Sequence, residues 1–321
     1  AIIAPDTNMS RVATAFELVG ERNTGDPAVL RDFLTWTMTV APANHYAVVL
    51  WNHGGGLSGV NFDDESGYDS LTVKEIQQAV AQSGVKPGVL AYDACLMGNV
   101  EQFYELRAVA PYQVASEEVI SGPGYDYRNA FAPLASGTPA SVTPEALARG
   151  LVTAFTTSYV NDGESTLAAI SSDRLAAVAG AVKTFAGLAA GFTPAQAARL
   201  VTIAKAVTRF EFQQYVDMKQ FMTRAAAAAD LPAAVRTAAT AVVQALEAAV
   251  VARMADKRQT GGMSLYVPTT TAEELPEAGL FTDWAAATNW AAVVNRMLGR
   301  SAPSRAGIGS GAWAAFAPRP R

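Results

Sequence analysis

The chain contains very few of the side chains on which several common kinds of site depend. Its 321 residues include one cysteine, Cys95, and two histidines, His45 and His53. A single cysteine excludes an intramolecular disulfide, and these three residues cannot form a zinc cluster of the usual spacing. The glycine-rich fingerprints that bind nucleotide phosphates or dinucleotides are missing as well.

Basic residues and long apolar runs are also scarce. The chain has 24 Lys and Arg against 29 Asp and Glu, which gives a net charge of −5. This balance argues against a nucleic-acid partner, whose binding would require a basic patch. No apolar run reaches the ~18–20 residues of a membrane span, and no signal peptide is visible. Half of the residues are hydrophobic, which is typical of a folded globular protein.

Short apolar runs alternate with helical patterns in the first half of the chain. Asp26-Pro27 is a typical helix start, and Thr72 with Glu75 forms a capping-box pattern. The apolar runs have the length of buried strands and cover 46–51, 85–92 and 112–116. The resulting order of helix, strand, helix, strand, helix, strand predicts an open, mainly parallel α/β sheet with flanking helices.

The second half is rich in alanine and predominantly helical in pattern. Helices are expected over 173–191, 194–208, 212–229, 232–256 and 283–298, with strands over 166–171 and 263–267. We therefore expect a catalytic core over 1–150 and a helical subdomain over 151–300 that contributes further strands to the sheet. The remaining residues, 301–321, lack periodicity and are expected to be a mobile tail.

Two reactive side chains follow the ends of two predicted strands. His53 comes two residues after Trp51, and Cys95 comes three residues after Tyr92. Ligands of open parallel sheets bind beyond the carboxyl ends of the strands. If the two strands are neighbours, both side chains therefore face the same crevice. His45 precedes its strand and is expected to have a structural role at the opposite end of the sheet.

A cysteine beside a histidine suits nucleophilic catalysis, because the thiolate attacks and the imidazole exchanges the proton. A helix is expected to begin at Cys95, and its N-terminus would lower the pKa of the thiol. The backbone N–H groups of Gly54 and Cys95 could hold an oxyanion. The alternatives are a packed thiol and a histidine bonded to backbone. His-Gly-Gly-Gly also resembles a lipase oxyanion loop, but no Gly-x-Ser-x-Gly elbow and no later histidine exist.

Two sequence blocks resemble a known family. Leu50-Trp-Asn-His-Gly-Gly-Gly56 and Tyr92-Asp-Ala-Cys-Leu-Met-Gly98 are similar to the signature blocks of clostripain-type cysteine peptidases. That family belongs with caspases, legumains and gingipains in one superfamily. Weaker similarity extends over roughly residues 15–300. The resemblance implies a caspase-like fold, endopeptidase activity and cleavage after Arg, with Lys as a second choice.

Carried over residue by residue, the resemblance makes Cys95 the nucleophile and His53 the acid and base. Asp93 matches the acidic residue of the S1 pocket, where a carboxylate can hold a guanidinium through two hydrogen bonds. Its alternative role is to cap a helix that begins near Cys95. Glu117 and Asp126 are further candidates for substrate binding at the rim of that pocket.

The resemblance also bears on metals and location. Some relatives use calcium, for which the acidic loop Asp63-Asp64-Glu65 offers oxygen ligands, although such a loop can equally be a solvated surface. No other cofactor is implied. A secreted or periplasmic bacterial protein is expected from the family alone.

The chain departs from the family pattern in two respects. Relatives usually have two further strands upstream, and their absence would leave an exposed sheet edge. This departure favours an alternative function, a non-catalytic binding or assembly module that keeps the peptidase fold. A further alternative is a peptidase that cleaves after Asp or Asn.

The second departure concerns maturation, because some relatives cut themselves after a basic residue in the loop that follows the histidine. Residues 54–73 contain no Lys or Arg, so no self-cleavage is expected there.

Overall fold

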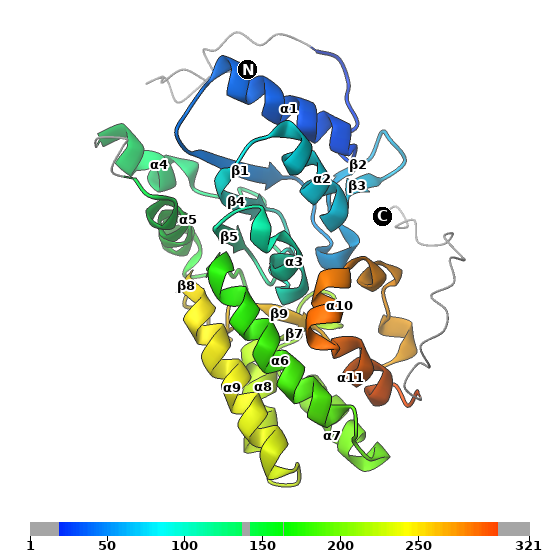
Figure 1. Ribbon diagram of the computed structural model, residues 1–321. Coiled ribbons are helices and arrows are strands. Elements are labelled where there is room, and N and C mark those ends of the chain that lie inside the picture. Colours follow the sequence, from blue (N-terminus) through cyan, green and yellow to red (C-terminus); the bar gives the residue numbers. More distant parts are fainter. Residues whose placement is uncertain (1–18, 137–141, 163, 301–321) are drawn as a thin grey trace.

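The centre of the molecule is a five-stranded sheet with the strand order β1-β4-β5-β6-β8 (Figure 1). The computed structural model describes residues 19–136, 142–162 and 164–300, so the predicted tail lies outside the described residues. β1, β4 and β5 are parallel, whereas β6 and β8 are antiparallel to their neighbours. The strands are β1 (Tyr46–Trp51), β4 (Pro87–Asp93), β5 (Tyr112–Ala115), β6 (Ala168–Ser171) and β8 (Val250–Arg253). The predicted mainly parallel α/β sheet is confirmed.

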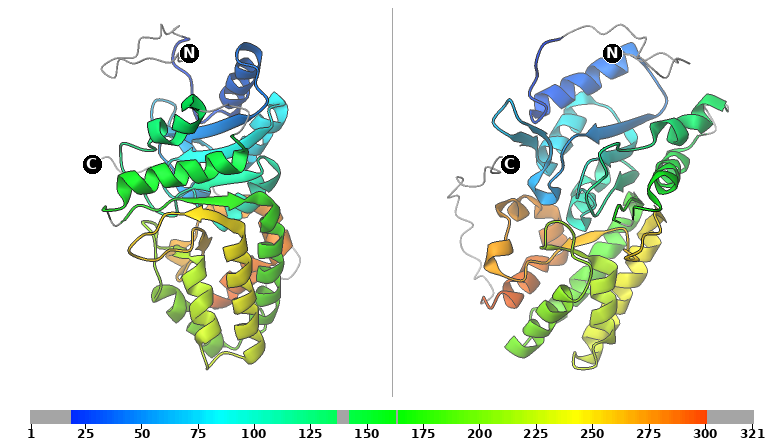
Figure 2. Two further views of the ribbon diagram at one scale, coloured as in Figure 1. Left: turned by 90° about the vertical axis from the view of Figure 1, so that its left-hand side faces the viewer. Right: turned by 180° about the vertical axis from the view of Figure 1, so that it is seen from behind.

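Both faces of this sheet are buried, because consecutive side chains of each central strand enter different cores. Leu90 and Tyr92 of β4 belong to one core, and Val89 and Ala91 belong to the other. One face is covered by α1 (Pro27–Val40), α2 (Val73–Ser83) and α3 (Val100–Glu105). The other is covered by α4 (Tyr127–Ser136) and α5 (Pro144–Tyr159) (Figure 2). Such a three-layer arrangement leaves the strand ends as the accessible part of the sheet.

The predicted helix starts in the first half are confirmed. The Asp26 carboxylate accepts a hydrogen bond from the Ala28 amide at the start of α1. At the start of α2, Thr72 and Glu75 form the reciprocal bonds of a capping box. These caps place both helices against the sheet at the positions that the hydrophobic pattern indicates.

Several helices of the second half extend beyond the side of the sheet where β8 lies (Figure 1). They are α6 (Leu175–Ala189), α7 (Pro194–Lys205), α8 (Met218–Ala227) and α9 (Ala233–Ala249). The segment predicted as one last helix is two, α10 (Thr282–Thr288) and α11 (Trp290–Met297). Asn289 separates them because its φ is +58°, which ends a right-handed helix.

Three further expectations about elements were wrong. The helix expected to reach residue 256 ends at Ala249, and the β-branched residues that follow enter the sheet as β8. The predicted strand near 263–267 forms β9 (Ser264–Tyr266), which pairs with β7 (Tyr215–Asp217) and not with the central sheet. The loop after the histidine contains a hairpin, β2 (Val60–Asp63) and β3 (Asp69–Leu71).

β1 is the outermost strand on its side of the sheet, and no described residue pairs with its free edge. Trp51 at the end of this strand is 68% exposed. In the described part of the chain, no helix combines the length and the apolar character needed to cross a membrane.

Candidate active site

The strands that precede the two predicted catalytic residues are direct neighbours in the sheet. β1 and β4 are parallel, and Trp51 lies opposite Asp93 in their register. His53 lies two residues beyond Trp51, and Cys95 lies two residues beyond Asp93, so the two occupy matched positions. The Gly54 backbone also lies against Cys95, since a Cβ added to Gly54 would be 2.2 Å from the Cys95 carbonyl oxygen. The histidine loop and the cysteine turn thus meet at one edge of the sheet.

Backbone contacts on both sides fix the path of the chain at His53. Its N–H donates to Asn52 Oδ1 at 2.6 Å, and its carbonyl accepts from the Asn61 N–H at 3.0 Å. Asn52 is itself held, because its Nδ2 donates to the Phe62 carbonyl at 3.2 Å. His53 is exposed, and its imidazole makes no hydrogen bond with the residues described. Solvent and substrate can therefore reach the ring.

Cys95 is half-buried and lies in a turn. The expected helix at this residue was wrong, because α3 begins only at Val100. Leu96 has a φ of +64°, outside the helical region, and its N–H donates to the Glu118 carbonyl at 3.1 Å. A helix dipole therefore does not act on the thiol. Instead, the Ile120 N–H lies 3.3 Å from Cys95 Sγ and donates a hydrogen bond to the sulfur.

The Asp93 carboxylate is buried, with 4% of the residue exposed. It accepts hydrogen bonds from the Tyr125 N–H at 3.1 and 3.2 Å and from the Tyr127 hydroxyl at 2.7 Å. Gly124 leaves space for it, because a Cβ there would be 2.6 Å from Asp93 Oδ2. No Lys or Arg in the described ranges forms an ion pair with it. The alternative role as a helix cap has no support among these contacts.

The tyrosines around Asp93 respond to its negative charge. Burial, reinforced by the Asp93 carboxylate, raises the pKa of Tyr125 and of Tyr127. Both hydroxyls therefore stay protonated, and the Tyr127 hydroxyl remains a hydrogen-bond donor to the carboxylate. Among the residues that the structure describes, the Asp93 carboxylate has hydrogen-bond donors around it but no ion-pair partner, so a positively charged ligand would stabilise its negative charge.

Asp126 lies next to this group, but its side chain has other partners. Its carboxylate accepts bonds from the backbone N–H and side chain of Asn129 and from the Ser158 hydroxyl. The hydrogen bond from the Asn129 backbone is the main cause that lowers the pKa of Asp126. These contacts give Asp126 a structural role at the start of α4.

Glu117 is placed elsewhere. It is 1% exposed, and its Oε2 accepts from the Gly262 N–H at 2.9 Å. Burial and the nearby Asp217 carboxylate raise its pKa well above the ordinary value. The structure thus joins Glu117 to the segments around β7 and β9 and not to the Asp93 carboxylate.

The acidic loop considered for calcium does not gather ligands. Asp63 accepts bonds from the N–H groups of Thr24 and Ser66 and from the Thr24 hydroxyl. Across residues 19–136, 142–162 and 164–300, no group of three or more His, Cys, Asp or Glu side chains could hold a metal ion. The donor set therefore does not fit a calcium site built from such side chains.

Sequence reasoning missed the Ile120 amide and the tyrosines that surround Asp93. A backbone N–H carries no signal in the residue type, so the contact with sulfur could not be anticipated. The Pro123-Gly-Tyr-Asp126 block, which resembles the family pattern, was the available signal for Tyr125. From the sequence, only Asp126 of this block is a candidate for the pocket, whereas the contacts with Asp93 come from the Tyr125 backbone and the Tyr127 hydroxyl.

Known proteins resemble this chain in both sequence and fold. The model of the clostripain family matches residues 5–277. Clostripain from Hathewaya histolytica is 32% identical over 136 residues, which are 36% of this chain and 26% of that protein. The chain therefore matches only about a quarter of the length of this curated relative.

Two solved structures share the fold. One is a secreted C11 cysteine protease from Bacteroides thetaiotaomicron in complex with an irreversible peptide inhibitor. Its TM-score is 0.65 at 18% identity, over 84% of this chain and 79% of that chain. The other is an inactive zymogen C11 protease from Parabacteroides distasonis. Its TM-score is 0.61 at 18% identity, over 87% of this chain and 79% of that chain. With the family model matching most of its length, the chain belongs to the clostripain family.

Proposed function

We propose that this protein is a cysteine endopeptidase that cleaves after basic residues, Arg first and Lys second, with Cys95 and His53 as its catalytic dyad. The observation that carries the proposal is the register of β1 and β4, in which Trp51 lies opposite Asp93. It puts His53 and Cys95 at matched positions beyond two neighbouring strands. Membership of the clostripain family supports the same chemistry.

In the proposed reaction, the Cys95 thiolate attacks the carbonyl carbon of the scissile peptide bond. The carbonyl oxygen becomes an oxyanion, which the N–H groups of Gly54 and Cys95 stabilise. His53, protonated by the thiol, gives its proton to the leaving amine, so the C–N bond breaks and a thioester remains. Water then attacks the thioester, His53 takes its proton, and the thiolate leaves with the carboxylate product released.

The Ile120 amide has a separate role in this proposal. Its N–H donates to Cys95 Sγ at 3.3 Å in the free protein. The Cys95 thiol in turn lies 4.0 Å from the Ile120 carbonyl oxygen, so the Ile120 backbone holds the sulfur at the start of the reaction.

Asp93 is the proposed S1 carboxylate for the basic side chain. It is buried, it accepts hydrogen bonds from Tyr125 and Tyr127, and it has no cationic partner within the described ranges. An arginine guanidinium would supply the missing positive charge and further donors. Asp126 is held at the start of α4 by Asn129, and Glu117 is held at the Gly262 amide, whereas Asp93 ends the strand that leads into Cys95, so Asp93 is preferred for this role.

Hydrolysis of fluorogenic peptides tests the proposal. A peptide ending in Arg, one ending in Lys and one ending in Asp are compared for the wild type, Cys95→Ala and His53→Ala. We expect turnover of the Arg peptide, slower turnover of the Lys peptide, none of the Asp peptide, and loss of turnover in both variants. Turnover of the Asp peptide alone would overturn the P1 assignment. An inert wild type that a peptidyl-Arg electrophile does not label would favour a non-catalytic module.

A further inference from the structure

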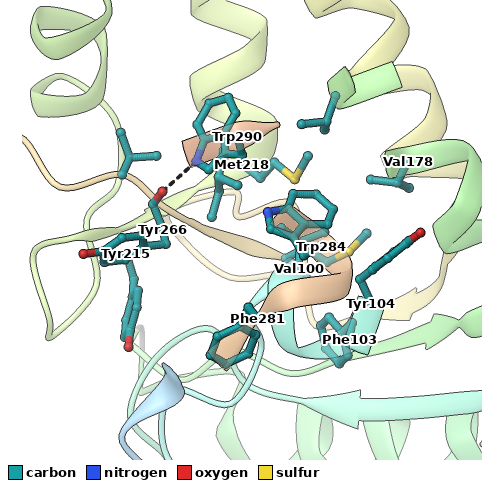
Figure 3. Close-up of a cluster of buried hydrophobic side chains, with 14 of the residues drawn as sticks. Val100, Phe103, Tyr104, Val178, Tyr215, Met218, Tyr266, Phe281, Trp284 and Trp290 are labelled. Carbon is teal, nitrogen blue, oxygen red and sulfur yellow. Dashed lines mark hydrogen bonds between the residues drawn. The ribbon is translucent and has the colours of Figure 1, made fainter. Parts of the chain in front are cut away.

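Tyr215 is a buried tyrosine from the second half of the chain that reaches the histidine loop. It is the first residue of β7, it is fully buried, and it pairs with Tyr266 of β9. Figure 3 shows the two tyrosines next to each other in the core, and their ring centroids are 6.5 Å apart. The two side chains share a ladder and a core, but their hydroxyl groups have different partners.

The Tyr215 hydroxyl bonds twice to the glycine loop that follows His53. It donates to the Gly55 carbonyl at 3.1 Å and accepts from the Leu57 N–H at 2.9 Å. Burial raises the pKa of Tyr215, so the hydroxyl keeps the proton that it donates. One side chain thus satisfies a buried acceptor and a buried donor that lie two residues apart.

The shape of the loop matches the tyrosine ring closely. Gly56 has a φ of +64°, and a Cβ added to it would lie 2.7 Å from the Tyr215 ring and hydroxyl. Glycine is therefore required at this position for conformation and for space. The close approach limits the positions that the loop can take while the two hydrogen bonds are present.

The same loop follows one residue of the proposed dyad and lies against the other. Gly55 is two residues after His53, and Gly54 lies against the Cys95 carbonyl. One end of the loop is fixed by β1, through the register with β4. The other end is fixed by the Tyr215 hydroxyl. The loop is a run of three glycines with little conformational preference of its own. The Gly55 N–H also donates to the Gly59 carbonyl at 2.9 Å, so the Tyr215 hydroxyl adds to a backbone bond within the loop.

We propose that Tyr215 is a positioning residue, whose hydroxyl holds the Gly54–Gly56 loop in the conformation that keeps Gly54 against Cys95 and His53 in reach of the thiol. The inference rests on the proposed function for its catalytic consequence. Tyr215 is fully buried beneath the loop, so a bound peptide would meet the loop and not the tyrosine, and we expect the hydroxyl to act on the chemical step and not on substrate binding. It also links the second half of the chain to the site.

The test compares Tyr215→Phe with Tyr266→Phe. Each variant removes one buried hydroxyl and keeps the ring, and the two residues are partners in the same ladder. The Tyr266 hydroxyl accepts from the Leu275 N–H at 2.8 Å, in a different segment from the histidine loop. The control therefore has a similar effect on the β7 and β9 core without releasing the glycine loop.

We expect Tyr215→Phe to lower kcat on the Arg peptide by about 10-fold or more, since a misplacement of ~1 Å can cost on the order of 100-fold. KM should stay within about twofold, because binding groups are untouched. Tyr266→Phe should keep both constants within about twofold of wild type. Wild-type kcat in Tyr215→Phe, or equal losses in the two variants, would overturn the proposal.

Hydrogen exchange followed by mass spectrometry gives a readout that does not depend on activity. Peptides that cover residues 54–61 should exchange about 10-fold faster in Tyr215→Phe and at the wild-type rate in Tyr266→Phe. If the wild type proves inert on every peptide, the proposed function fails while faster exchange still supports the hold on the loop. Unchanged exchange in Tyr215→Phe overturns the inference whether or not the chain is active.

Discussion

Glu117 and Asp217 bind consecutive backbone amides. Glu117 Oε2 accepts from the Gly262 N–H at 2.9 Å, and Asp217 Oδ2 accepts from the Gly261 N–H at 2.5 Å. Both residues are buried, and their bonds to adjacent amides bring the two carboxyl groups close together. Burial first, and then the neighbouring carboxyl, raises the pKa of Glu117, and burial raises that of Asp217. Protonation of the pair offsets the repulsion that two buried negative charges would create.

Because of this pair, we expect the free energy of unfolding to fall as the pH rises. The folded state binds the proton more tightly than the unfolded state, in which Glu117 has its ordinary pKa of 4.5. The contribution is therefore fully present below that value and is lost as the pH rises through the higher folded pKa. Glu117→Gln keeps an oxygen for the Gly262 amide and removes the titration. We expect urea unfolding between pH 4 and pH 8 to show that the unfolding free energy of the variant rises relative to that of wild type as the pH increases. The difference should grow by at most about 1.4 kcal/mol per pH unit for one proton.

Glu101 provides the control for this prediction. It is also buried, and burial raises its pKa from 4.5 to about 7, so it contributes a loss of the same sign. Because it is present in both proteins, its effect cancels in the difference between wild type and Glu117→Gln. Glu101→Gln should remove only the part of the loss that occurs between pH 4.5 and about 7. Parallel curves for wild type and Glu117→Gln would contradict the raised pKa of Glu117.

The main sheet could be predicted from local pattern, because its central strands are continuous apolar runs. The run 46–51 ends in Asn-His-Gly, and the run that contains Tyr92 ends in Asp-Ala-Cys. Those boundaries placed His53 and Cys95 at strand ends, and the register of Trp51 with Asp93 confirms that the strands are neighbours.

What could not be predicted depends on contacts between distant segments. The turn at Cys95 follows from the bond of Leu96 to Glu118, which the helical pattern after Cys95 does not reveal. Glu117 has the residue type of an S1 carboxylate, but its carboxylate accepts a hydrogen bond from the N–H of Gly262, 145 residues further along the chain. Whether a carboxylate can bind substrate or has a structural role thus depends on partners that only the tertiary structure brings together.

Asp93→Asn should separate charge from hydrogen bonding in the proposed S1 pocket. The amide oxygen can still accept from the Tyr125 N–H, so the local structure is retained while the negative charge is lost. We expect kcat/KM for the Arg peptide to fall by about 100-fold or more, as when one partner of a buried charge pair is removed.

Alkylation of Cys95 by iodoacetamide is the control for Asp93→Asn. A small neutral reagent does not use the S1 pocket, so its rate should match that of wild type. Slower alkylation together with slower hydrolysis would mean that the substitution disturbs the dyad. A wild-type kcat/KM on the Arg peptide would remove Asp93 from the pocket.

Gly54→Ala should damage both stability and activity. The added Cβ would be 2.2 Å from the Cys95 carbonyl oxygen, a backbone atom that cannot move without shifting the cysteine turn. Overpacking of this kind costs about 1–3 kcal/mol of unfolding free energy. We also expect hydrolysis to fall on the order of 100-fold, because the loop must move away from the thiol.

The matched control for Gly54→Ala is Gly187→Ala. Gly187 lies within α6, is exposed and has nothing within 4 Å of an added Cβ. The same substitution should stabilise the protein by about 1 kcal/mol there, because alanine favours helix. Thermal and urea unfolding of the two variants should therefore change in opposite directions. A Gly54→Ala protein with wild-type stability would show that the loop can leave Cys95 at little cost.

The chain should stay intact across the loop that follows His53. A peptidase with a basic P1 preference needs Lys or Arg, and residues 54–73 contain neither. Lys74, the first basic residue beyond them, lies in α2, where its ammonium group pairs with the buried Glu105 carboxylate. After long incubation at a concentration that hydrolyses the Arg peptide, intact mass and a denaturing gel should show one unbroken chain in this region.

Cys95→Ala incubated in parallel identifies cuts made by contaminating proteases. A cut within residues 54–73 that is present in wild type and absent from Cys95→Ala would refute the prediction, and it would also weaken the basic P1 assignment, because no Lys or Arg is available there to direct it.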